Sequence, residues 1–250
     1  MTDWTMKGLS WDNPLRIRSA AELTSWVQEI GFLPFFANEV AGFSAEEHVA
    51  SNAWWTGNKS TDPWEWREEI AATHTVAYGK FFDGRAGFIS HQWLPFFANV
   101  RRNGWDFDGK WQDGMAPARE KAIMEHFVNV ESEDEPEFTG TAILSTELKR
   151  QAGFGKGGEK NYPGILTGLQ MQLYLVIGGF RRRTNKNGSA YGMPVSVIMT
   201  PESIWGYEHL ASAYNEEPSK SWQRIYDHTQ ALWSADERDI VKLIGKKSEG

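Results

Sequence analysis

The sequence predicts an α+β fold, on three observations. A helical pattern near residue 117 is followed by a short strand pattern. Two helical patterns separated by a glycine-rich turn come next, and then two strand patterns separated by a basic loop. Helix, strand, helix, helix, strand, strand is the order of a winged helix-turn-helix domain, which we place at about 116–200. We expect it to pack with a mixed α/β part at 1–110 and with C-terminal helices at 201–250.

Helix starts in the N-terminal part are marked by capping residues. Ser19 and Glu22 form a capping box for a helix that ends at Gly31. Ser44 to Glu47 is a second box, predicting a helix to about residue 53, and Asp62 opens a third before Pro63.

A β-hairpin is predicted over 76–90. Asp83-Gly84 lies between two runs of apolar and aromatic residues and is the residue pair that a type I′ turn prefers. The polar, glycine-rich stretch from 104 to 114 is a plausible domain boundary.

The hexapeptide Leu-Pro-Phe-Phe-Ala-Asn occurs at 33–38 and again at 94–99. We interpret both copies as a repeated structural corner with an aromatic core and an Asn that closes a turn. Most of the 13 tryptophans should also be core, because Trp buries a large area and needs one polar partner. A stacking role for Trp54 or Trp55 is the less favoured alternative.

The predicted winged helix is read from local signals. Pro117 starts a helix, 138–143 is a short strand, and a helix from Ser145 ends at Gly153. A helix at 163–168 follows, and then the alternation from Leu169 to Leu175 predicts a strand. A basic loop at 181–187 and a returning strand at 193–200 complete it. Further helices are expected at 200–214, 218–232 and 234–245.

Composition excludes several functions. The chain has no cysteine, so disulfides, thiolate metal sites and cysteine nucleophiles are excluded. The six histidines form no metal-binding spacing, and we expect no metal and no cofactor. No apolar run approaches the length that spans a bilayer, and the first residues do not resemble a signal peptide, so we expect a cytoplasmic protein without a membrane partner.

Charge is distributed unevenly. The chain carries a net charge of −7, yet the segment 145–190 holds eight basic and only two acidic residues. Such a sign asymmetry indicates one basic face, and phosphate binding relies on Lys and Arg. The alternative is a solvated basic turn. The candidate DNA-binding residues are Lys149, Arg150, Lys156, Lys160, Arg181, Arg182, Arg183 and Lys186.

Gln170 and Gln172 are the candidate catalytic residues. On the predicted strand their side chains would share one face, where two amides could hold a water or a polar substrate atom. The simpler alternative is that they are solvent-facing strand residues.

The sequence Leu169-Gln170-Met171-Gln172, beside a basic hairpin, resembles the glutamine–apolar–glutamine motif of the AlkZ family of bacterial DNA glycosylases. The whole chain more closely resembles a group of shorter AlkZ-related proteins of unassigned function. The segments that carry this likeness are 62–66, 77–82, 153–160 and 166–172. The enzymes themselves are longer, with tandem winged helices and a β-barrel, and have the motif near their N-terminus.

The resemblance implies DNA repair: binding of duplex DNA, damaged or intact, and hydrolysis of the N-glycosidic bond of a damaged purine. An alkylated purine is cationic and leaves as a neutral base, so two amide dipoles that hold water and favour positive charge at the sugar would suffice. Two alternatives stay open. One is a noncatalytic nucleic-acid binder or transcriptional regulator, and the other is a protein-interaction module whose basic loop folds against acidic parts of the chain.

Overall fold

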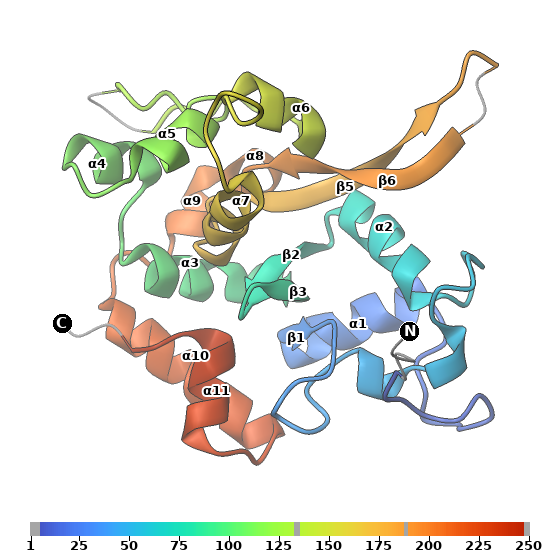
Figure 1. Ribbon diagram of the computed structural model, residues 1–250. Coiled ribbons are helices and arrows are strands. Elements are labelled where there is room, and N and C mark those ends of the chain that lie inside the picture. Colours follow the sequence, from blue (N-terminus) through green and yellow to red (C-terminus); the bar gives the residue numbers. More distant parts are fainter. Residues whose placement is uncertain (1–5, 133–135, 188–189, 248–250) are drawn as a thin grey trace.

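The computed structural model describes residues 6–132, 136–187 and 190–247. Within them, two antiparallel sheets are surrounded by helices, which confirms the α+β prediction (Figure 1). The first sheet has the order β1-β3-β2, with β1 at Phe32–Pro34, β2 at Val76–Phe82 and β3 at Arg85–Ser90. The second has the order β4-β6-β5, with β4 at Ile143–Leu144, β5 at Val176–Thr184 and β6 at Ala190–Met199.

The first sheet is formed largely as predicted. Asp83 (φ 49°) and Gly84 (φ 71°) both have positive φ, as a type I′ turn requires, and they join β2 to β3. A register shift between Gly79 and Phe82 puts a bulge in β2. Helices α1 (Ala20–Ile30) and α2 (Pro63–Thr73) flank this sheet and begin at the predicted caps Ser19 and Asp62.

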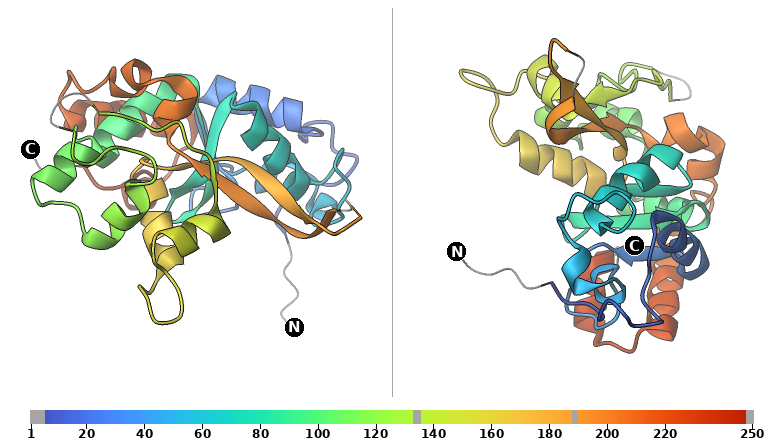
Figure 2. Two further views of the ribbon diagram at one scale, coloured as in Figure 1. Left: turned by 90° about the horizontal axis from the view of Figure 1, so that it is seen from above. Right: turned by 90° about the vertical axis from the view of Figure 1, so that its right-hand side faces the viewer.

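The second sheet is accompanied by α4 (Phe107–Gln112), α5 (Ala118–Met124), α6 (Ser145–Gln151) and α7 (Tyr162–Met171). Its β5–β6 hairpin is long, and its distal part projects from the body of the molecule (Figures 1 and 2). The helix α2 packs against β5, so α2 supports the base of the hairpin.

The C-terminal helices pack against the N-terminal half of the chain. They are α8 (Pro201–Trp205), α9 (Tyr207–Ala211), α10 (Pro218–Leu232) and α11 (Glu237–Ile244). Helix α10 packs on α3 (Leu94–Arg102). The main hydrophobic core therefore combines residues of the first hundred positions with Leu210, Trp222 and Ile240, whereas a second core lies among residues 107–198. The division into 1–110, 116–200 and 201–250 stays a prediction.

The predicted strand over Leu169–Leu175 is wrong. Helix α7 continues to Met171, Gln172 caps it, and β5 begins at Val176. The sequence alternates like a strand although it is helical, because this helix is buried on two sides. Leu169 faces the second core, while Gln170 is buried against β2. Leu173 then takes a left-handed conformation (φ 59°) that turns the chain into β5.

Other predicted elements differ in extent. The segment from Ser44 to residue 53 forms two 3₁₀ turns (Glu46–His48 and Ser51–Ala53) rather than one helix, although Glu47 N–H does bond to Ser44 Oγ. Gly206 divides the helix expected at 200–214. The basic loop is mostly strand, since β5 reaches Thr184. Helices α3 and α4 were not predicted.

Candidate nucleic-acid interface

The β5–β6 hairpin carries the strongest concentration of predicted DNA-binding residues. Arg181 and Lys186 are exposed. Arg182 instead reaches back to α2, where its Nη2 lies 3.1 Å from Glu65 Oε2 and 3.5 Å from Glu68 Oε1. The side chain of Arg183 and the Gly188 part of the predicted turn lie outside the described residues. The described hairpin therefore offers at least two exposed cations.

The other four predicted basic residues are exposed on α6 and on the loop after it. Lys149 and Arg150 lie in the last turn of α6, and Arg150 is 3.8 Å from Glu147. Lys156 and Lys160 lie on the loop before α7. This loop and the hairpin project in different directions (Figure 2, left view), so the structure does not gather all the basic residues at one point.

Gln170 is buried in α7, with 2% of its surface exposed. Its Oε1 accepts a hydrogen bond from the Lys80 backbone N–H at 3.1 Å, and its Nε2 donates to Leu166 O. Lys80 lies in the bulge of β2, and no strand partner among the described residues takes its N–H. The Gln170 amide therefore satisfies a backbone donor that the bulge leaves unpaired.

Gln172 points away from Gln170, toward α4 and α5. Its Oε1 accepts from Lys110 Nζ at 2.6 Å, and its Nε2 lies 3.3 Å from Glu120 Oε1. Lys110 and Glu120 are themselves 3.6 Å apart. The two predicted catalytic amides thus do not share one face, because residues two apart on a helix diverge by about 200°.

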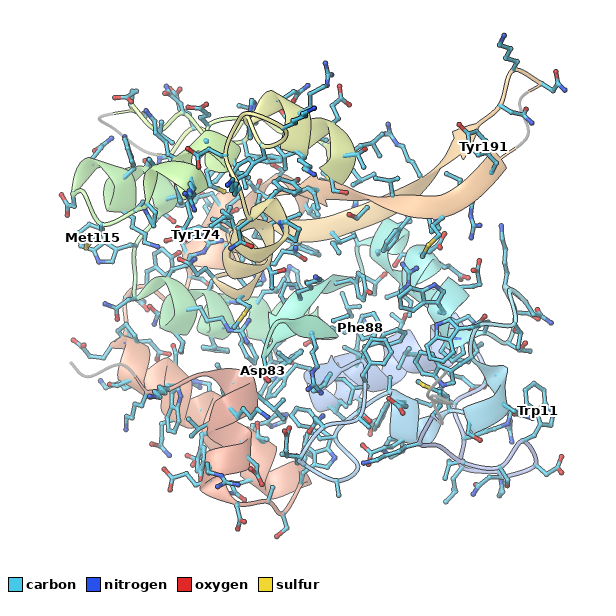
Figure 3. The ribbon with its side chains drawn as sticks, viewed as in Figure 1. Trp11, Asp83, Phe88, Met115, Tyr174 and Tyr191 are labelled. Carbon is cyan, nitrogen blue, oxygen red and sulfur yellow. The ribbon has the colours of Figure 1, made fainter. Side chains whose placement is uncertain are left out.

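The turn that follows Gln172 is held by a buried cation. Arg102, at the end of α3, donates from Nη2 to the carbonyl of Leu173 and is paired with the buried Glu202. Burial by itself lowers the pKa of Arg102, but the Glu202 carboxylate and its other neighbours raise it well above the ordinary value. Arg102 therefore stays charged and fixes the exit of α7. Figure 3 shows the neighbouring Tyr174 beside α7, far from Tyr191 on the hairpin.

Sequence reasoning missed Lys110 and Glu120, the partners of Gln172. Lys110 lies in α4, within the stretch interpreted as a linker, and neither residue belongs to a recognisable motif. Among the described residues, no cluster of His, Asp or Glu could hold a metal ion. Likewise, no helix in the described part of the chain is long and apolar enough to cross a bilayer.

The fold and the exposed cations define an α+β protein with a projecting, basic β-hairpin and a polar cluster at the end of a buried helix. A family model described as AlkZ related matches residues 17–245. The chain therefore belongs to the AlkZ-related family. Searches of the curated proteins and of the solved structures found no match.

Proposed function

We propose that this chain is a winged-helix DNA-binding protein related to the AlkZ alkylpurine DNA glycosylases. The element order α5, β4, α6, α7, β5, β6 and the sheet order β4-β6-β5 support the winged-helix assignment. The observation that carries the proposal is the projecting hairpin, which holds Arg181 and Lys186 exposed in a chain of net charge −7. Family membership supports DNA as the partner.

The hairpin should bind the sugar-phosphate backbone and be indifferent to base sequence. Helix α7 stands where a winged helix has its recognition helix, yet Tyr162–Met171 contains no Lys or Arg. Arg181 and Lys186 are suited to phosphate contacts, which position a protein without reading sequence. A protein-interaction role would need the hairpin to fold against the acidic body. Within the described part of the hairpin, the ion pairs of Arg182 with Glu65 and Glu68 of α2 favour that.

Binding of labelled duplex DNA, measured by fluorescence anisotropy at several salt concentrations, tests this proposal. The double variant Arg181→Ala/Lys186→Ala should bind more weakly on every sequence, and its salt slope should fall by about two. Arg238→Ala is the matched control, because this arginine is 94% exposed and lies on α11. If the wild-type chain does not bind duplex DNA at low salt, the proposal is wrong.

Hydrolysis of the N-glycosidic bond of a damaged purine is the second candidate function, and family membership favours it. Gln172 is the better-placed member of the predicted catalytic pair. Its amide is only half-buried and adjoins the Glu120 carboxylate, whose Oε2 has no hydrogen-bond partner among the described residues. Both glutamines have their amide atoms hydrogen-bonded within the fold, so the difference between them is that Gln170 is buried whereas Gln172 is partly exposed.

Release of N7-methylguanine from alkylated duplex DNA tests hydrolysis. Gln172→Ala should abolish release while the protein stays folded. The comparison variant is Gln170→Glu, whose buried carboxyl group, when protonated, can still accept the Lys80 N–H and donate to Leu166 O. If the wild-type chain binds the duplex but releases no base above background, the noncatalytic binding role remains.

A further inference from the structure

Trp55 combines two unusual features. Its backbone has φ 57°, the left-handed region that favours glycine, and its side chain is 49% exposed. The preceding Trp54 is buried and packs against Phe35 and Phe36. A backbone that is strained and an indole that is left in solvent are both unfavourable in isolation, so this position is a candidate for function.

Trp55 lines a groove made of two adjoining pockets. One pocket, of about 810 Å³, is formed by Phe36, Trp55 and Trp64 together with Arg85. The second, of about 560 Å³, shares Phe36, Trp64 and Arg85 with the first. It extends along α2 to the base of the β5–β6 hairpin, and its further residues include Arg67, Tyr78 and Lys80. The first pocket, the aromatic end of the groove, also holds Lys7 and Arg85, and the second adds two more cations among apolar residues of β5 and β6.

Arg67 is buried in the floor of the second pocket, with 3% of its surface exposed. Its guanidinium lies 3.7 Å from the ring centre of Trp64 and 4.4 Å from that of Phe180. Its Nε has no hydrogen-bond partner among the described residues, and its nearest carboxylate, Glu68, is 3.7 Å away. The groove thus contains a buried positive charge that lies against two aromatic rings, with Glu68 and Tyr78 as its polar neighbours.

Two further cations, Lys80 and Arg85, are exposed along the same groove. Their bonds within the fold are long: Lys80 Nζ lies 3.4 Å from Thr167 Oγ1, and Arg85 Nη1 lies 3.5 Å from Ala37 O. The carboxylate that lines the aromatic end, Glu46, already accepts from the N–H groups of Lys7 and Ala37. An anionic ligand is therefore favoured over a cationic one.

We propose that this groove binds a single-stranded segment of nucleic acid, with unpaired bases on the aromatic rings of Trp55, Trp64 and Phe36 and phosphates beside Lys80 and Arg85. A duplex hides the faces of its bases, whereas an unpaired base can stack on an indole, and rings interleaved with cations are the usual single-strand surface. Cation repulsion from Arg85 and Lys7 argues against a quaternary ammonium ligand in the aromatic end.

Residues of β5 and β6 line part of the groove, but the hairpin cations Arg181 and Lys186 do not, so this proposal and the duplex-binding proposal can fail separately. Arg181→Ala/Lys186→Ala should weaken duplex binding and leave single-strand binding by the groove nearly unchanged. Variants of the groove residues should weaken single-strand binding and leave duplex binding nearly unchanged. A chain that binds no duplex but retains single-strand binding would overturn only the earlier proposal.

Fluorescence anisotropy with labelled oligothymidylate and oligouridylate of about ten nucleotides tests the groove. Trp55→Ala should weaken binding about tenfold or more. Trp55→Gly should do the same with a backbone suited to positive φ, which guards against misfolding as the cause. Trp105→Ala is the matched control, since Trp105 is 38% exposed and its carbonyl bonds to Tyr174, away from the groove.

An abasic oligonucleotide of the same length separates stacking from charge. The wild-type chain should bind it about tenfold more weakly than oligothymidylate, and Trp55→Gly should show a smaller difference between the two strands, because Trp64 and Phe36 remain for stacking. Lys80→Ala/Arg85→Ala should reduce the salt slope, with Arg238→Ala as control. Equal binding of normal and abasic strands by the wild type, or unchanged binding by both Trp55 variants, would overturn the proposal. The DNA and RNA strands show which source of unpaired bases is preferred.

Discussion

The chain contains Leu-Pro-Phe-Phe-Ala-Asn twice, and the two copies fold differently. At 33–38 the residues begin in β1 and leave it through a turn, whereas at 94–99 they form the first two turns of α3. In the first copy Phe35 is buried and Phe36 is half-exposed. In the second the order is reversed, because Phe96 is half-exposed and Phe97 is buried.

Each copy takes the conformation that its neighbours stabilise. Leu33 and Pro34 pair with β3, and Pro34 is tolerated because β1 lies at the edge of its sheet. In the second copy Pro95 occupies the first turn of α3, where a missing N–H has no consequence. The difference teaches that six identical residues do not decide strand or helix here. It also leaves Phe36 available to the groove, whereas Phe96 packs against Trp93.

The two pairs of phenylalanines should show the largest effects. Phe35→Ala and Phe97→Ala each remove a fully buried ring, so each should lower the free energy of unfolding by about 3–5 kcal/mol. Phe36→Ala and Phe96→Ala should cost about 1–2 kcal/mol, because these rings are partly exposed. Urea unfolding measures all four. The structure predicts that the first phenylalanine costs more in the copy at 33–38 and the second costs more in the copy at 94–99. If the same position of the pair cost more in both copies, the structure would be contradicted.

The two asparagines should differ next. Asn99 is fully buried, and its Nδ2 donates to Glu216 O and Ser221 Oγ on the way into α10. Asn38 is partly exposed and only closes its own turn, with bonds to Val40 and Phe43. We expect Asn99→Ala to cost about 2 kcal/mol and Asn38→Ala about 1 kcal/mol in thermal unfolding. A larger loss of stability for Asn38→Ala than for Asn99→Ala would contradict the assignment of the long-range hydrogen bonds to Asn99.

Alkaline pH should affect a neighbour of the first copy. The ring of Tyr78 packs edge-on against Phe35, and burial raises the pKa of Tyr78 from 10.0 to about 12. A raised folded-state pKa contributes stability that is complete below pH 10 and is lost as the pH rises toward 12. Between pH 10 and 11, wild type should therefore lose about 1 kcal/mol more than Tyr78→Phe does. Urea unfolding of both proteins at these pH values measures this difference. Equal losses of stability in wild type and Tyr78→Phe would contradict the prediction.

The two alanines should give the smallest difference. Ala98 is buried within α3, so Ala98→Gly should cost about 1 kcal/mol from helix propensity alone. Ala37 lies in the loop after β1, and Ala37→Gly should cost only a few tenths of a kcal/mol. Thermal unfolding measures the loss of stability of each variant. Equal losses would contradict the structure, in which residue 98 is helical and residue 37 lies in a loop.

Elements with strong local signals were predictable. The caps Ser19 and Asp62 and the turn Asp83-Gly84 all confirm their predictions, since each acts through bonds or dihedral angles within a few residues. Helix α3 was not predictable from a hexapeptide that also occurs in β1. The strand predicted at Leu169 failed because a helix buried on two sides mimics alternation.

The candidate site was predictable only in its composition. Charge counting found the basic hairpin, but Arg182 is paired with Glu65, which is 117 residues away in the chain. The partners of Gln172 come from α4 and α5, and no local pattern joins them to α7. The contacts that decide what a polar side chain does are long-range, so they required the fold.

The bond from Gln170 to the β2 bulge bears on how variants of this chain should be judged. Removing that amide leaves Lys80 N–H without its acceptor, so loss of any activity on Gln170→Ala would report a damaged joint between α7 and β2. The glutamine at this position is therefore explained by its structural role alone. A catalytic role is better tested at Gln172, because a substitution there leaves the hydrogen bond between α7 and β2 intact.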